Sequence, residues 1–323
     1  MCAKRLEANE GGGMTEVRTR TAIRGTKEPV RAVNRWLIGI ASALGVFQLV
    51  ALPLVLLPRD PAWGWSLLVP VLLTTPFWSL IHEAVHGTLL ERRAHNDGCG
   101  RALAVLYGSP FALLKAGHLL HHRYSRTRER TEIYDPATSS WSKAAPGYYL
   151  RLFGGLYLLE VAAVLLAVAP APVLRRLARR LDAPDSVSGP LLERIAQAGT
   201  LARFRIDAGA IIALHTAAFL AYGAHSWMLL AALGGRALII SVSDNAYHYG
   251  TDLDAPLEAM NLRLPRPLER LALNFSLHGV HHRHPGLHWY ELRDRFEADG
   301  LHYHLGWTAA AARQLRGPIA LRG

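Results

Sequence analysis

The chain has 323 residues, of which 50% are hydrophobic and 19% are charged, and its mean hydropathy is positive. This composition leaves too little polar surface for a soluble domain of that length, so we expect an integral membrane protein. The formal net charge of +11 does not predict nucleic acid as a partner, because the basic residues flank apolar segments and form no stripe interleaved with aromatic residues.

The N-terminal part predicts a polar tail followed by a transmembrane hairpin. Residues 1–35 are polar and include a Gly-Gly-Gly run, which is typical of a flexible cytoplasmic tail. Residues 36–57 form an uncharged run of about 22 residues, long enough to cross a bilayer core of about 30 Å. After the turn Pro-Arg-Asp-Pro, residues 62–81 are apolar and return to the starting side. His82 should therefore emerge at the cytoplasmic face.

Three further apolar segments follow. Residues 101–117 contain a Gly-Ser-Pro break and are too short to span, so we expect an interfacial or shallow re-entrant path. The block 209–242 is long enough for two short crossings hinged near Gly223, or for one crossing plus an interfacial helix. The basic run Arg-Arg-Leu-Ala-Arg-Arg should face the cytoplasm, which favours a shallow hairpin over 152–174 and a full hairpin over 209–242. Which block supplies the second pair of crossings stays open.

Together these segments predict an all-α integral membrane protein with about four transmembrane helices, interfacial helices and a cytoplasmic histidine-rich cap. We place the membrane domain at residues 36–295 and a cytoplasmic C-terminal tail at 296–323.

Histidine clusters stand at the ends of the apolar segments. One cluster has i, i+4 spacing and two have i, i+3, i+4 spacing: His82 and His86; His118, His121 and His122; His278, His281 and His282. On helices each set falls on one face. These imidazoles exceed what one zinc ion uses, so two metals are implied. We add His248, because it follows an apolar segment that returns to the same face. The two cysteines are too few for a thiolate site.

The first cluster alone has a second interpretation. His82-Glu83-Ala84-Val85-His86 matches the His-Glu-x-x-His zinc motif of proteases, with Glu83 as base. A zinc intramembrane protease leaves the other clusters without a role, and no later Asp-Gly motif on an apolar segment supplies its third ligand. A transporter should hold its site near the bilayer midplane, whereas these clusters lie at segment ends. Zinc has no redox states, so a polyhistidine pair of metals favours iron and oxygen activation.

Carboxylates near the clusters are candidates for fixing the tautomer of a ligating imidazole. They are Glu83, Glu132, Asp135, Asp244 and Asp252, and a solvated surface role for any one of them stays open. Such carboxylates are also possible partners for Arg123 and Arg283. We expect His215 and His225 to be buried or interfacial. The other histidines should lie around the site or at the surface: His95, His284, His288, His302 and His304.

Three stretches carry a family resemblance. His-Glu-Ala-Val-His-Gly with the later Asn96, His-Leu-Leu-His-His-Arg-Tyr, and the stretch 274–292 resemble the three histidine boxes of the membrane fatty acid desaturase family in order, spacing and surroundings. The resemblance spans roughly residues 36–295. It implies an integral-membrane helical fold and a cytoplasmic di-iron centre with O2 as co-substrate. The implied ligands are His82, His86, His118, His121, His122, His278, His281 and His282, with His248 as a further ligand.

The resemblance also implies a function and partners. We expect an O2-dependent acyl-lipid or acyl-thioester desaturase that acts on a membrane lipid or acyl chain. Its electrons would come from a separate ferredoxin, rubredoxin or cytochrome b5 type of donor. We expect a multi-pass protein of the cell (inner) membrane whose histidine boxes and termini face the cytoplasm. A hydroxylase or a carotenoid ketolase on the same scaffold stays open.

Overall fold

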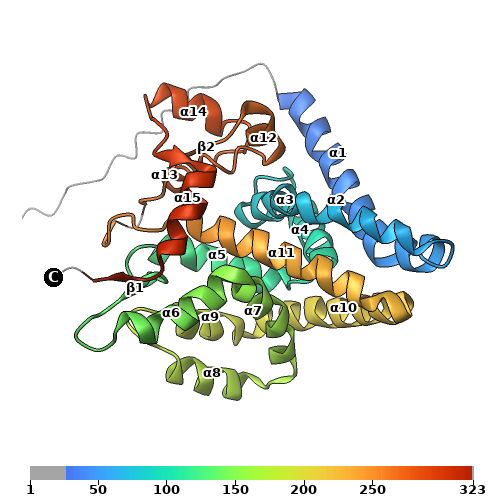
Figure 1. Cartoon of the computed structure of the whole chain (residues 1–323), viewed down its shortest axis with the longest axis horizontal. Coiled ribbons are helices and arrows are strands. Elements are labelled where there is room, and N and C mark those ends of the chain that lie inside the picture. Colours follow the sequence, from blue (N-terminus) through green and yellow to red (C-terminus); the bar gives the residue numbers. More distant parts are fainter. Residues whose placement is uncertain (1–26, 256, 322–323) are drawn as a thin grey trace, which may run out of the picture.

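Helices make up nearly all the regular structure in the residues that the computed structural model describes, 27–255 and 257–321 (Figure 1). Most of the predicted cytoplasmic tail lies outside them, since residues 1–26 are not described. The first helix already begins at Lys27, so the predicted boundary at residue 35 falls inside a helix.

The elements follow one another in three groups along the chain. The first comprises α1 (Lys27–Val46), the π-helical η1 (Phe47–Leu56), the 3₁₀-helical η2 (Pro61–Leu67), α2 (Leu68–Leu72), α3 (Thr74–His86), α4 (Arg93–Tyr107) and α5 (Phe111–Tyr124). The second comprises β1 (Ile133–Tyr134), α6 (Trp141–Leu150), η3 (Arg151–Gly155), α7 (Leu156–Ala162), η4 (Ala163–Val168), α8 (Ala171–Arg180), α9 (Ser188–Ile195), α10 (Ala198–Tyr222), η5 (Gly223–His225) and α11 (Ser226–Ala246). The third comprises β2 (Leu262–Arg263), α12 (Arg266–Leu271), α13 (His278–Arg283), α14 (Leu292–Ala298), β3 (Leu305–Gly306), α15 (Trp307–Arg313), η6 (Gln314–Arg316) and β4 (Ile319–Ala320).

The first predicted hairpin is present, with a bend in its returning arm. The run Ala32–Leu56 is long and apolar enough to cross a membrane. The chain then turns, and the Asp60 carboxylate accepts a hydrogen bond from the Ala62 backbone N–H at 2.8 Å, which caps η2. The arm formed by η2, α2 and α3 passes the same test as a pair bent by 46°. It ends at Gly87, whose φ of 80° stops α3 directly after the first histidine cluster.

The second hairpin is formed by α10 and α11, which meet at η5 and diverge from there (Figure 1). The hinge predicted near Gly223 is confirmed, and its φ of 53° suits a residue without a Cβ. The turn ends of the two hairpins pack together, because Leu52 of η1 lies in one apolar cluster with Tyr222 and Leu229. The Tyr222 hydroxyl also donates to the Gln48 carbonyl at 2.8 Å.

The apolar block predicted as a shallow hairpin over 152–174 is longer than expected. A helical run from Trp141 to Val168 is long and apolar enough to span. It is kinked at Gly154, where φ is 123° and an added Cβ would lie 3.2 Å from the Ala237 Cβ. After Pro170 the chain enters α8, which carries the basic run. The sequence did not predict this longer helix, because the first turns of the helix are only moderately apolar.

Helices α4 and α5 meet at 104° around the predicted Gly-Ser-Pro break. At the end of α4 the Val105 carbonyl receives only a 3.2 Å bond from the Gly108 backbone N–H, and the Tyr107 carbonyl has no backbone donor in the described residues. Side chains from other helices satisfy them: the Tyr157 hydroxyl and Arg236 Nη1 donate to the Tyr107 carbonyl at 2.6 and 2.9 Å, and His215 Nε2 donates to the Val105 carbonyl at 2.9 Å. Polar residues within apolar helices thus compensate for broken helical bonding.

Helix α5 is also anchored where it begins. The Asp207 carboxylate of α10 accepts from the Ala112 backbone N–H at 2.9 Å and pairs with Arg101 of α4 at 3.2 Å. A carboxylate at a helix N-terminus is favourable because it meets unpaired N–H groups. This anchor orients the helix that carries the second histidine cluster.

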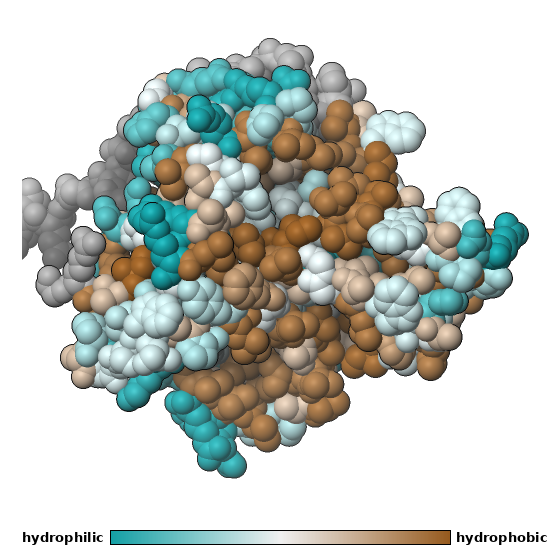
Figure 2. Space-filling model, viewed as in Figure 1, coloured by the Kyte–Doolittle hydropathy of each residue, from teal (hydrophilic) through white to brown (hydrophobic). Residues whose placement is uncertain are grey.

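Length and composition allow three to five membrane-spanning segments, a range that contains the predicted four. Large apolar side chains face outward, among them Leu72 and Leu220, each 72% exposed. Figure 2 shows apolar residues over much of one face and hydrophilic residues gathered over the cap near α12 and α14. Trp65 and Trp227 are exposed at the hairpin turns, as is typical of a membrane interface. This surface fits a lipid environment.

Residues 296–321 pack against the rest of the chain, which differs from the separate tail predicted. Strand β4 pairs with β1, and β3 pairs with β2, both in parallel. Gln314 is fully buried; its amide donates to the Val242 carbonyl and accepts from the Asn245 amide, each at 2.9 Å. The sequence did not predict these contacts, because the segment is polar in composition and its partners lie far away in the sequence.

The break between α4 and α5 generates a stability prediction. Arg236→Met keeps an elongated side chain but removes the donors to the Tyr107 carbonyl and to Gln48 Oε1. The Tyr107 carbonyl keeps its bond from the Tyr157 hydroxyl, but the buried Gln48 Oε1 loses its donor, which should cost about 1–3 kcal/mol of unfolding free energy. We expect a lower thermal unfolding midpoint for the purified protein in detergent, and no such change for Arg59→Met at the exposed hairpin turn. Equal midpoints for both variants would contradict the capping role of Arg236.

Candidate metal centre

Each histidine cluster occupies a helix end on the same side of the hairpins. The first lies in the last turn of α3, the second in the last turns of α5, and the third within α13. His248 lies in the turn after α11, where its backbone N–H donates to the Asn245 carbonyl at 3.1 Å. The structure therefore brings all of the predicted histidines to one place.

The nine histidines divide into two groups, in each of which one ring nitrogen per residue lies within 4.8 Å of the others. The first group is His82, His86, His118, His122 and His281. The second group is His121, His248, His278 and His282. The second and third clusters each contribute to both groups, because residues i+3 and i+4 of one helix face point at different angles. The sequence predicted the set, and the structure adds its division.

The first group has more close contacts than hydrogen bonding can satisfy. His118 Nε2 lies 2.9 Å from His86 Nε2 and 3.1 Å from His122 Nε2, which in turn lies 3.0 Å from His281 Nε2. A nitrogen of a neutral imidazole carries either one hydrogen or one lone pair, so it cannot form a full hydrogen bond with each of two neighbours. A cation that accepts a lone pair from each nitrogen would satisfy all of them. Separations of about 3 Å are those of adjacent ligands about 2.1 Å from one ion.

The second group repeats this arrangement. His282 Nε2 lies 3.2 Å from the Nε2 atoms of both His121 and His278. The Nε2 atoms of His82 and His248 are buried and have no hydrogen-bond partner in the part of the chain that the structure describes. These two nitrogens complete the two groups. Both groups therefore fit a bound cation.

Burial favours the neutral form of the histidines on α13 and of His248 in the turn after α11. Desolvation, followed by neighbouring imidazoles, lowers the pKa of His248, His278 and His281 well below its usual value, and the same causes act on the pKa of His282. A neutral ring retains the lone pair that a metal requires.

Glu129 is a partner of the site that the sequence did not single out. His121 Nδ1 donates to Glu129 Oε2 at 2.7 Å, and Arg151 Nη2 lies 3.9 Å from the other carboxylate oxygen. This bond leaves the lone pair of His121 on Nε2, the atom that faces the second group. Glu129 lies on the loop after α5, three residues before the predicted Glu132, and no sequence pattern distinguishes the two.

Glu132 has a different role from the one predicted. It pairs with Arg126 at 2.9 Å, both side chains being 1% exposed, and it accepts from the Gly250 backbone N–H at 3.0 Å. Arg126 Nη2 also donates to the Thr251 carbonyl at 2.7 Å. This buried clamp joins the loop after α5 to the turn that carries His248. It acts on the positions of two histidine-bearing segments, and among the described residues neither of its side chains hydrogen-bonds to an imidazole.

The other predicted partners bond to residues other than the nine histidines, although, against the effect of burial, Asp244 together with Glu129 raises the pKa of His121. Asp135 accepts from the Ala137 backbone N–H, Asp244 lies 3.9 Å from Arg151, and the Asp252 carbonyl accepts from Arg126 Nε; Arg123 lies over the Tyr124 ring, and Arg283 lies 3.9 Å from Glu258. Within the described residues, none of these side chains hydrogen-bonds to the nine histidines.

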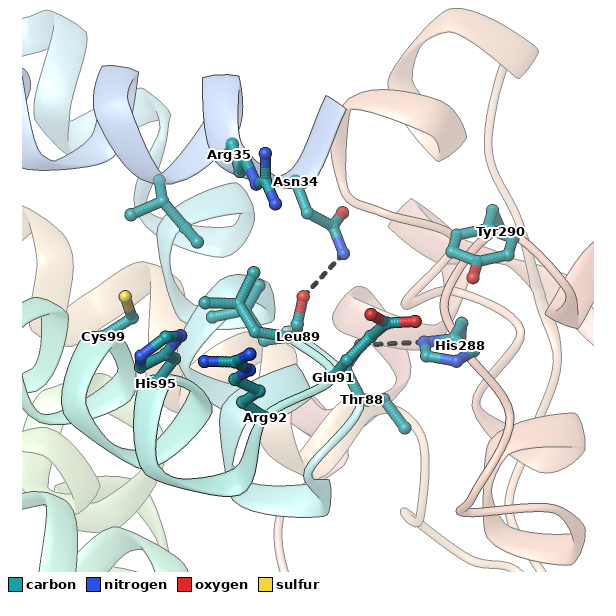
Figure 3. Close-up of a pocket in the computed structure, with 12 residues that line it drawn as sticks. Asn34, Arg35, Thr88, Leu89, Glu91, Arg92, His95, Cys99, His288 and Tyr290 are labelled. Atoms are coloured by element: carbon teal, nitrogen blue, oxygen red, sulfur yellow. Dashed lines mark hydrogen bonds between the residues drawn. The ribbon is translucent and has the colours of Figure 1, made fainter. Parts of the chain in front are cut away.

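Glu83 ties the first cluster to the segment after the third. Its Oε2 accepts from the Thr88 hydroxyl at 2.7 Å and from the Trp289 backbone N–H at 3.2 Å. Beside this contact, a cavity of about 500 Å³ lies against α1, and in it His288 Nδ1 donates to the Thr88 carbonyl at 2.8 Å (Figure 3). The buried Glu83 carboxylate is thus held as a structural link, which does not favour the role of a protease base.

Gly279 provides a test of the geometry. A Cβ at this position would clash with the Ala259 carbonyl and lie 3.1 Å from Asn261 Oδ1. Gly279→Ala should therefore displace α13 and reduce metal content several-fold, measured by elemental analysis of the purified protein. Gly286→Ala is the control, because its Cβ would meet no atom within 4 Å. Equal metal content in both variants would contradict the close fit of α13.

Glu129 provides a second test. Glu129→Gln removes the charge that supports His121, so we expect metal affinity to fall about 10–100-fold. Competition with a chelator, followed by metal analysis, measures this loss. Asp135→Asn, on an exposed turn, should retain metal as the unaltered protein does. Undiminished retention in Glu129→Gln would show that this contact does not support metal binding.

Comparison with known proteins identifies the family. No curated protein and no solved structure matches the chain. The family model described as Fatty acid desaturase matches residues 61–307, which include every histidine of the two groups. Since the match covers well over half of the sequence, the chain belongs to the fatty acid desaturase family.

Proposed function

We propose that this protein is an O2-dependent acyl desaturase with one iron ion in each histidine group. The observation that carries the proposal is the division of nine buried or half-buried histidines into groups of five and four at one end of apolar helices. Imidazole ligands suit iron, and two ions account for all nine rings. Family membership supports the same chemistry.

Two bound irons would supply the activation of O2 and the removal of hydrogen from an unactivated methylene. The chain itself would hold the ions, exclude water and orient the ligands. His121 and Glu129 fix one ligand tautomer, while the Arg126–Glu132 clamp holds two ligand-bearing segments together. The apolar helices around the site would admit an acyl chain from the bilayer.

The balance of the reaction requires a partner. Removing two hydrogens from adjacent methylenes supplies two electrons and two protons, whereas reducing O2 to two waters consumes four of each. Two electrons and two protons must therefore come from elsewhere. We propose a separate donor of the ferredoxin, rubredoxin or cytochrome b5 type. We place the protein in the cell (inner) membrane, with the histidine groups facing the cytoplasm.

The contacts in the site do not support a protease function. His82 and His86 share their group with three further histidines, and Glu83 is bound to Thr88 and Trp289. Hydroxylation and carotenoid ketolation use the same kind of site, so they remain outcomes that the product will distinguish.

Lipid analysis of an expressing host tests the function. We expect acyl chains that have lost two hydrogens, and their loss, together with bound iron, in His281→Ala. The exposed His302→Ala should leave both unchanged. A product with added oxygen would replace desaturation by hydroxylation or ketolation. Unchanged lipids from an iron-loaded protein supplied with a donor would contradict the proposal.

A further inference from the structure

Residues 314–320, here called the terminal segment, contact the turn that carries His248. This turn is built on Asn245 in the last turn of α11, because the Asn245 carbonyl accepts from the backbone N–H groups of both His248 and Tyr249, at 3.1 and 2.9 Å. A contact that fixes Asn245 therefore also helps to fix the position from which the His248 ring reaches the second histidine group.

Gln314 of the terminal segment supplies such a contact. Its side chain is fully buried; its Oε1 accepts from Asn245 Nδ2, and its Nε2 donates to the Val242 carbonyl, each at 2.9 Å. Both partners belong to the last two turns of α11. A buried amide must have its hydrogen-bonding groups paired, so this one holds the end of α11 in a single arrangement.

Tyr249 supplies a second contact, on the residue that follows His248. Tyr249 is 2% exposed, and its hydroxyl donates to the Gly317 carbonyl at 2.7 Å. Gly317 has a φ of 85°, and a Cβ there would lie 2.9 Å from the Tyr149 hydroxyl, so the close approach requires glycine. The terminal segment thus bonds to residues that precede and follow His248 in the chain.

The backbone of the terminal segment also reaches the buried ion pair between Arg126 and Glu132. The Ile319 N–H donates to the Glu132 carbonyl at 2.7 Å, beside the pairing of β4 with β1. The Glu132 carboxylate accepts in turn from the Gly250 backbone N–H at 3.0 Å. The turn that carries His248 is therefore bonded both to this ion pair and to the terminal segment.

These contacts favour one histidine group over the other. His248 belongs to the second group, whereas every member of the first group lies on α3, α5 or α13. Within the described residues, the terminal segment forms no hydrogen bond with these three helices. A change in the terminal segment should therefore act on the second group and leave the first group nearly unaffected.

We propose that Gln314 and Tyr249 are positioning residues for His248, through which the terminal segment sets the affinity of the second histidine group for its ion. The inference rests on the proposed function, because it concerns the same metal centre. Residues that orient a ligating histidine without touching the ion are part of a metal site, and their loss lowers metal affinity about 10–100-fold.

Titration of the metal-free, detergent-purified full-length protein with Co²⁺ tests the assignment without turnover. Imidazole ligands bind this ion, and its visible absorption follows each binding step. We expect two steps for the unaltered protein. Gln314→Leu, which keeps a side chain of similar length but loses both amide bonds, should raise the Kd of one step about 10–100-fold.

His248→Ala identifies the step that belongs to the second group, and Gln314→Leu should weaken the same step. If Gln314 acts through His248, the two substitutions will not add, so Gln314→Leu should change the Kd little in the His248→Ala protein. Tyr249→Phe, which removes only the hydroxyl, should weaken this step to a smaller extent. Leu315→Ala is the matched control, since this neighbouring side chain is 56% exposed, and it should leave both steps unchanged.

Equal weakening of both steps by Gln314→Leu would reduce its role to general stability and overturn the proposal. So would an additive loss with His248→Ala, or an unchanged Kd in both Gln314→Leu and Tyr249→Phe. If Gln314→Leu does not fold, Tyr249→Phe decides alone. Two Co²⁺ steps with the expected selectivity, in a protein that yields no altered acyl chains, would count against the proposed function and not against the positioning of His248.

Discussion

Crowded imidazole nitrogens impose the constraint on which the rest of this structure depends. His118 and His122 each have an Nε2 about 3 Å from two other Nε2 atoms, and His282 repeats this in the second group. A buried polar atom without a partner is costly, and a neutral ring nitrogen has only one hydrogen-bonding role. Bound cations would remove this cost and would contribute their binding free energy to the stability of the fold.

The remaining architecture holds those nitrogens in place. Two apolar hairpins bring α3 and the end of α11 to the same side, and the broken pair α4–α5 aims the second cluster at them. The break exposes carbonyls within apolar surroundings, and Arg236, Tyr157 and His215 satisfy them. Buried polar residues in these helices thus serve the geometry of a site that they do not touch.

The sequence predicted the histidines of the site more completely than it predicted the residues that hold them in place. Spacing was sufficient for eight of the nine histidines, because a helix converts i, i+3, i+4 spacing directly into a shared face. His248 was predicted because it follows an apolar segment that returns to the same face. The Gly-Ser-Pro break and the hinge at Gly223 were predicted from local backbone preferences. Glu129 was missed and Glu132 misassigned, since their partners depend on how a loop folds onto distant residues. For the same reason the packed C-terminal segment looked like a tail, although Gln314 is fully buried.

Metal content per chain, with iron and zinc measured together on the detergent-purified protein, tests the central claim most directly. Two histidine groups predict two iron ions per chain after expression in iron-replete medium. A single zinc ion without iron under the same conditions would contradict a di-iron centre. It would leave one of the two groups, and its crowded nitrogens, without an explanation.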